Sequence, residues 1–117
     1  MLGDPKSNAV KERNLEEKFE GSISSRIETS LARLSSLKNN KSIEIRLHCS
    51  PLYCSLYRFD DELFVTPHLY GLRGKSAPLF LFKRTEEGLF YSYEKHFDDI
   101  WGTAEVKKWD EIISVVV

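Results

Sequence analysis

The chain has 117 residues, of which 41% are hydrophobic and 30% are charged, and its formal net charge is −1. This composition is typical of one soluble globular domain with a modest core. The near-zero charge excludes a strong positive field toward nucleic acid or anionic membranes, and without an apolar run of about 20 residues or a signal peptide we expect a cytoplasmic protein.

The first predicted element is a short strand at Met1–Leu2, which ends at the turn-forming run Gly-Asp-Pro. A long amphipathic helix follows, because apolar residues recur at steps of three and four along the next part of the chain. Asn14 precedes the first of them and is predicted to cap this helix. Arg26 and the other polar residues of the opposite face are expected to be solvated. The apolar stripe consists of Leu15, Phe19, Ile23, Ile27, Leu31, Leu34 and Leu37.

Three β runs are expected at Ser42–His48, Ser55–Phe59 and Leu63–Thr66, with an acidic turn at Asp60-Asp61-Glu62. Apolar and polar residues alternate in the first run, so one of its faces is predicted to be buried. The most apolar run, Pro78–Arg84, is predicted to lie in the centre of the sheet.

Apolar and aromatic residues recur again at helical spacing from Leu89 to Ala104, which predicts a second long helix that packs on the sheet. Residues 106–117 are predicted to form a tail whose apolar end is an edge strand or an exposed strip. The order of elements predicts an α+β fold, similar to an α/β sandwich. Two long helices are expected to cover a mixed sheet in a domain that spans residues 1–105.

Four side chains of metal-ligating types occur in the central stretch, at His48, Cys49, Cys54 and His68. Adjacent residues of a strand point to opposite sides, so His48 and Cys49 do not readily converge on one ion. We therefore expect no metal ion and no other cofactor, and we expect the two thiols to stay reduced.

Two enzyme motifs are incomplete in this sequence. Ser55, with His48 or His68 and an aspartate, supplies the residue types of a hydrolytic triad, but neither a nucleophile elbow nor an oxyanion loop lies beside it. The run Gly-Leu-Arg-Gly-Lys at residues 71–75 is glycine-rich and basic but lacks the Walker spacing. Neither motif therefore identifies an enzyme.

Tyrosines occur close to arginines in the central stretch. Tyr53, Tyr57 and Tyr70 lie near Arg46 and Arg58, and this mixture can stack a base and hold a phosphate. The same side chains can also fill a core between sheet and helix with their hydroxyls at the rim. The residues alone leave both interpretations open.

Several short motifs together carry a family resemblance. They are Leu2-Gly3-Asp4-Pro5, Arg46-Leu47-His48, Pro51-Leu52-Tyr53, SLYRFDD at residues 55–61, PHLYG at residues 67–71, and Phe97 with Trp101 and Ala104. On these residues the chain resembles a bacterial domain of unknown function that is usually found at the C-terminus of helix-turn-helix (XRE-type) transcriptional regulators. That family is similar in turn to one half of the phospholipase D-like fold, and the match extends to about Glu105.

Phospholipase D enzymes carry a motif, His-x-Lys-x4-Asp, in which the histidine is the nucleophile and the lysine binds the phosphate. With the aspartate of this motif placed on Asp60, its lysine falls on Ser55 and its histidine on Tyr53. The resemblance therefore implies a relative that has lost both the nucleophile and the cation, and that binds a ligand without turning it over.

The resemblance implies a non-catalytic ligand-sensing or effector domain associated with bacterial transcriptional regulation, with a phosphate-bearing small molecule as its ligand. Two alternatives stay open, a residual phosphodiesterase that uses His48 or His68 and a purely structural dimerisation module. The expected ligand-binding residues are Arg46, His48, Tyr53, Ser55, Tyr57, Arg58, Asp60, His68 and Tyr70.

The partners follow from the same resemblance. No helix-turn-helix precedes Met1, so direct binding to nucleic acid is not carried over from the family. The family's first strand is shortened here to Met1–Leu2, which is expected to leave an open edge. Because phospholipase D folds place two halves face to face, the resemblance implies a homodimer.

Overall fold

The computed structural model describes residues 1–17 and 22–106, and within them the chain forms helices and strands in the α+β class that the sequence predicts. The helices are α1 (Asn8–Glu16), α2 (Ser22–Leu34) and α3 (Leu89–Thr103), with short 3-10 helices at Ser35–Leu37 and Gly74–Ser76. The strands are β1 (Leu2–Gly3), β2 (Arg46–His48), β3 (Cys54–Phe59), β4 (Glu62–Pro67), β5 (Phe80–Lys83) and β6 (Glu105–Val106). None of the described helices is long and apolar enough to cross a membrane.

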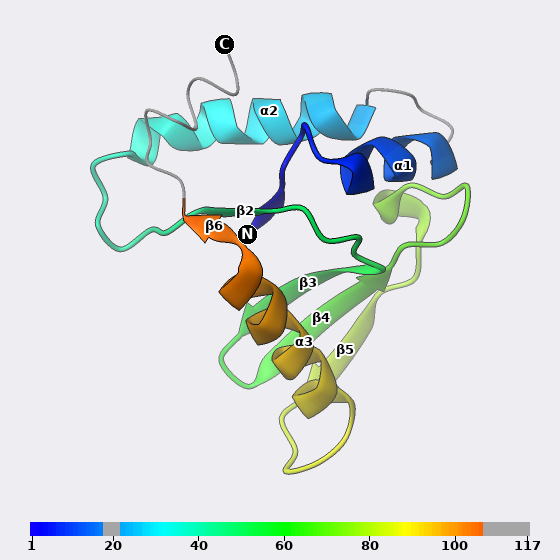
Figure 1. The fold of residues 1–117 in the computed structure, drawn as a ribbon. Helices are drawn as coiled ribbons and strands as arrows, with labels where there is room; N and C mark the ends of the chain where they lie inside the picture. The colour runs from blue at the N-terminus through cyan, green and yellow to red at the C-terminus, as the bar shows by residue number, and fades with distance from the viewer. Residues whose placement is uncertain (18–21, 107–117) are drawn as a thin grey trace.

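The strands divide into two three-stranded sheets, where the sequence analysis expected one. In the first sheet β1 pairs in parallel with β2, and β2 pairs antiparallel with β6. In the second sheet β3, β4 and β5 follow one another in antiparallel order. The helices α1 and α2 lie over the first sheet, and α3 lies across the second (Figure 1).

The predicted central position of Pro78–Arg84 is wrong, because β5 is an edge strand and β4 takes the centre of the second sheet. Phe80 and Leu81 of β5 are 48% and 46% exposed. The apolar residues of a run indicate how much apolar surface the strand can bury, but not whether it pairs with one neighbouring strand or with two.

The predicted first helix is two helices in the described residues, and Asn14 does not cap it from outside. Asn14 lies inside α1 and is buried, and its side-chain oxygen accepts a hydrogen bond of 2.8 Å from the backbone N–H of Ile23 in α2. The side chain of Ser7 caps α1 instead, accepting from the N–H of Val10. Phe19 lies outside the described residues.

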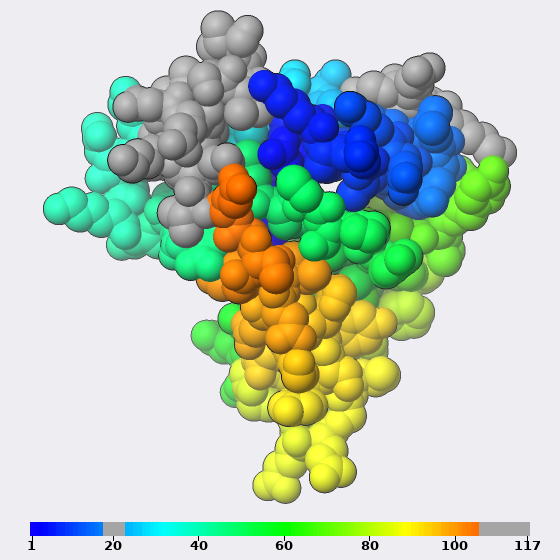
Figure 2. Space-filling view, viewed as in Figure 1, coloured from blue at the N-terminus to red at the C-terminus, as the bar shows by residue number. Residues whose placement is uncertain are grey.

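Each sheet has its own core. Between α1, α2 and the first sheet lie Val10, Ile27, Leu31, Ile45 and Leu47. Between α3 and the second sheet lie Cys54, Leu63, Val65 and Phe90. The space-filling view shows the broad helical layer above a narrower lower part that tapers toward the loop between β5 and α3 (Figure 2).

Two local predictions are confirmed closely. Strands β3 and β4 form a hairpin whose turn is Asp60-Asp61, and Asp60 has a φ of 52°, a conformation that aspartate tolerates better than most residues. The helix predicted from Leu89 to Ala104 is α3. The predicted tail lies outside the described residues beyond Val106, where β6 ends.

The two-helix arrangement predicts opposite outcomes for two leucines that the sequence places on one stripe. Leu31 is fully buried in α2, so Leu31→Ala should lower the free energy of unfolding by about 2–5 kcal/mol. Leu15 is 65% exposed on α1, so Leu15→Ala should change it by less than about 0.5 kcal/mol. Urea unfolding measures both values. Equal losses would show that the two side chains share one buried stripe.

Candidate functional site

A groove of about 740 Å³ runs between the helical layer and the β3–β4 hairpin. Residues from α1 and α2 form one wall, and residues from the 48–57 segment, from the end of β4 and from the 73–75 loop form the other. The strand alternation explains which hairpin residues face it. One face of the hairpin packs in the core under α3, through Cys54 of β3 and Leu63 and Val65 of β4. Ser55, which pairs with Thr66, lies on the other face and lines the groove.

The groove collects five of the nine predicted site residues. His48 is buried at the end of β2, Ser55 and His68 are half-buried, and Tyr53 and Tyr57 are 75% and 55% exposed. The tyrosines therefore lie at the mouth of the groove rather than in a core. Of the two interpretations that the sequence left open, the exposure of these two rings favours contact with solvent or ligand.

Arg46 does not line the groove. Its Nη1 donates a 2.9 Å hydrogen bond to the carbonyl of Trp101, its Nε lies 2.8 Å from Glu44 Oε1, and its guanidinium lies 4.1 Å above the Trp101 ring. These contacts join β2 to the end of α3. Arg46 thus has a structural role that the sequence did not indicate.

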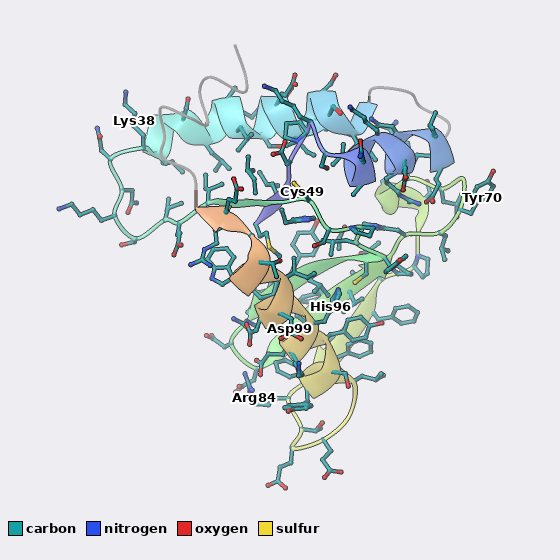
Figure 3. The ribbon with its side chains drawn as sticks, in the orientation of Figure 1. Lys38, Cys49, Tyr70, Arg84, His96 and Asp99 are labelled. Atoms are coloured by element: carbon teal, nitrogen blue, oxygen red, sulfur yellow. The ribbon has the colours of Figure 1, made fainter. Side chains whose placement is uncertain are left out.

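The other three predicted residues also lie away from the groove. Arg58 points toward α3, where its Nη1 lies 3.5 Å from both Glu94 Oε2 and Asp98 Oδ1. Asp60 forms the hairpin turn at the opposite end of the strands. Tyr70 is 78% exposed and projects outward from the loop after β4 (Figure 3).

The Ser55 hydroxyl and the His68 ring form a hydrogen-bonded pair inside the groove. Ser55 Oγ lies 3.1 Å from His68 Nε2, and His68 Nδ1 lies 2.9 Å from the carbonyl oxygen of Leu52. A carbonyl can only accept, so Nδ1 carries the proton and Nε2 accepts from the hydroxyl of Ser55. Burial lowers the pKa of His68, with a further lowering from Arg13, against the Leu52 hydrogen bond and nearby glutamates.

Arg13 and Glu17 form the floor on the helical side. The Arg13 side chain is 13% exposed, and its Nε lies 3.2 Å from Glu17 Oε2. Its Nη2 donates to the carbonyls of Leu72 at 3.0 Å and Leu69 at 3.4 Å, which ties α1 to the loop after β4. Arg26 of α2 lies 3.3 Å from the second oxygen of Glu17.

Four basic residues that line the groove are not among the residues predicted from the sequence. They are Arg13, Arg26, Arg73 and Lys75. Arg26 was placed on a solvated face, and Arg13 comes from a segment far from Arg73 and Lys75 in the chain. The glycine-rich run at residues 71–75 was a local signal for Arg73 and Lys75, although it lacks the Walker spacing.

In the described part of the chain no group of three or more histidine, cysteine and acidic side chains is arranged to hold a metal ion. Cys49 is an exposed free thiol, and Cys54 is a buried one whose pKa is raised by burial. Burial also lowers the pKa of His48, which lies on the first sheet and not on the hairpin that carries His68.

The two lowered histidine pKa values predict how stability depends on pH. Below about pH 6.5 the two histidines bind protons in the unfolded chain but not in the folded one. The free energy of unfolding should therefore fall as the pH is lowered, until the pH reaches the folded-state pKa values of the two histidines. Denaturant unfolding between about pH 7.5 and about pH 5 measures this loss. The control is the His48→Gln, His68→Gln double variant, in which carboxylate titration remains. Parallel curves for both proteins would contradict the prediction.

No family model, curated protein or solved structure matches this chain. The function of the groove must therefore be argued from its own side chains.

Proposed function

We propose that the chain is a ligand-binding domain whose groove takes a phosphate-bearing small molecule. The observation that carries the proposal is the groove itself, about 740 Å³ in volume and lined by basic, tyrosine and hydroxyl side chains from both layers. Small-molecule sites are typically clefts of roughly 300–1,000 Å³ with a few polar groups that orient the ligand.

The charges of the groove favour an anion. Its four basic side chains outnumber its three acidic ones, Glu12, Glu16 and Glu17. Glu16 and Glu17 are both ion-paired with Arg13, and Glu17 also with Arg26. Lys75 is exposed at the groove and forms no ion pair within the described residues, so its ammonium group supports binding of a phosphate.

The aromatic side chains favour a ligand that also carries a ring. Tyr53 and Tyr57 belong to the same face of the hairpin, two positions on either side of Ser55, and both are more than half exposed. An exposed tyrosine offers a flat apolar surface on which a base or another ring can stack. A nucleotide-like molecule combines the two chemistries that the groove offers.

The biological role that we propose is ligand sensing in the cytoplasm, associated with bacterial transcriptional regulation. Its support is the resemblance to the C-terminal domains of helix-turn-helix regulators and to a phospholipase D-like half. In that resemblance Tyr53 and Ser55 stand where the catalytic histidine and lysine would be, which supports binding without phosphodiester hydrolysis.

A thermal-shift screen of nucleotides, phosphorylated metabolites, lipid headgroups and inorganic phosphate tests the proposal. A ligand at a hundredfold excess over its Kd stabilises the folded state by about 2.7 kcal/mol, which for this size of domain raises Tm by several degrees. Lys75→Ala should reduce the shift, because the exposed ammonium at the groove is removed. Lys41→Ala is the matched control, since Lys41 is exposed outside the groove.

Three results would contradict the proposal. They are a flat screen, equal shifts in the two lysine variants, and stabilisation only by ligands without phosphate. Hydrolysis of a chromogenic phosphodiester that is lost on mutating His48 or His68 would support the phosphodiesterase alternative instead. A flat screen together with a stable dimer would favour the structural dimerisation module.

We also propose that the chain forms a homodimer, through the edge strand β5. Leu79, Phe80 and Leu81 are 60%, 48% and 46% exposed there, beside backbone groups that face away from β4. An apolar edge of this kind pairs readily with another copy.

Sedimentation velocity should show a dimer that Leu81→Lys converts to monomer. Leu37→Lys, at an exposed leucine after α2, is the control and should leave the dimer intact. A wild-type monomer at all concentrations would contradict this.

A further inference from the structure

The Ser55–His68 pair has the orientation of a nucleophile and its base. The carbonyl of Leu52, 2.9 Å from His68 Nδ1, fixes the ring so that the unprotonated Nε2 faces the Ser55 hydroxyl at 3.1 Å. A serine activated by an imidazole that a third group orients is the general arrangement of nucleophilic catalysis. Here the third group is a backbone carbonyl, and the aspartate expected for a triad is replaced by Leu52.

The hairpin holds this geometry in place. Ser55 pairs in register with Thr66 across β3 and β4, and the N–H of His68 donates a 2.7 Å hydrogen bond to the carbonyl of Tyr53. Ser55 is thus held inside the β3–β4 ladder, and His68, the first residue after β4, is held to the residue before β3 by its backbone hydrogen bond. Such rigid support is what a catalytic pair requires, because small displacements cost large factors in rate.

Two features suit the pair to react with a ligand. Ser55 and His68 both line the open groove, so a substrate has access to the hydroxyl. Burial lowers the pKa of His68, which leaves the ring neutral and able to take a proton near neutral pH. Arg13 from α1 acts in the same direction, whereas Glu16 and Glu17 oppose it.

A backbone donor that the ladder does not use also follows Ser55 in the chain. In an antiparallel ladder alternate residues face the partner strand, and the Tyr53–His68 and Ser55–Thr66 pairs fix that alternation in β3. The N–H of Leu56 therefore faces the open edge of β3, and among the described residues it has no backbone acceptor. Backbone donors next to a nucleophile are the usual stabilisers of an oxyanion.

We propose that Ser55 is the nucleophile and His68 the general base of an acyl-transfer activity on carboxylic esters. Ser55 Oγ attacks the ester carbonyl and forms the new C–O bond while its proton passes to His68 Nε2. The ester C–O bond then breaks, and the alcohol leaves with that proton. Water, deprotonated in turn by His68, attacks the acyl-serine and releases the acid and the free hydroxyl. The reaction needs no metal, oxidant or further co-reactant.

This inference uses the groove of the proposed function but does not depend on phosphate binding. Loss of ligand stabilisation in Lys75→Ala reports on the anion site, whereas covalent labelling of Ser55 reports on the nucleophile. Each proposal therefore fails separately.

A fluorophosphonate probe tests the pair on the full chain, because a serine that attacks phosphorus displaces fluoride and keeps the adduct. Intact mass spectrometry should show one adduct, and peptide mapping should place it on Ser55. Ser55→Ala should abolish it, and His68→Gln should slow labelling at least about a hundredfold. Ser92→Ala is the matched control, since Ser92 lies on α3 outside the groove. The wild-type rate should rise with pH through a midpoint below about 6.5.

A purely structural hydroxyl gives a different set of results. No adduct, an adduct at another residue, or a labelling rate that His68→Gln leaves unchanged would each overturn the proposal. The position of the adduct is read from the unmutated protein, so this outcome does not depend on the variants being folded. Turnover of p-nitrophenyl acetate that requires Ser55 would extend the result from a reactive serine to an esterase.

Discussion

The ion pair between Arg13 and Glu17 is the contact on which the groove depends. Both side chains have low exposure, and a charge in such a place is tolerated only when it is paired and hydrogen-bonded. The guanidinium is paired with the Glu17 carboxylate, and its Nη2 donates to the carbonyls of Leu69 and Leu72, whereas its buried Nε makes no hydrogen bond within the described residues. The N–H of Gly71 adds a 3.0 Å bond to the last turn of α1. Together these bonds fix the position of α1 relative to the loop after β4, and so the spacing between the helical layer and the hairpin.

The fold was predictable where the signal was local. Two short β runs on either side of an acidic turn predicted the β3–β4 hairpin, and helical spacing predicted α3 from Leu89 onward. The prediction failed where partners far along the chain decide the outcome. Leu15 has the right spacing for a stripe with Ile23, but it belongs to α1, whose inward face is Val10 and Asn14. Likewise β5 is apolar enough for a central strand but has one neighbour.

The candidate site follows the same division. Strand alternation places Ser55 toward the groove and Arg58 toward α3. This difference can be read from the sequence, but a prediction based only on residue types does not use it. The approach of Arg13 to the loop after β4 could not be predicted from local alternation, because it depends on how α1 packs against that loop. The pairing of Ser55 with His68 likewise required the register of the hairpin, and the acceptor that orients the ring is a backbone atom.

The most direct test of this account is the tautomer of His68, because the groove chemistry rests on which ring nitrogen carries the proton. Nitrogen-15 NMR of histidine-labelled protein at neutral pH distinguishes the two nitrogens by their chemical shifts. The two hydrogen bonds of the ring predict a protonated Nδ1 bonded to Leu52 and an unprotonated Nε2 that accepts from Ser55. A protonated Nε2 with a free Nδ1 would contradict it, since Ser55 would then have no base.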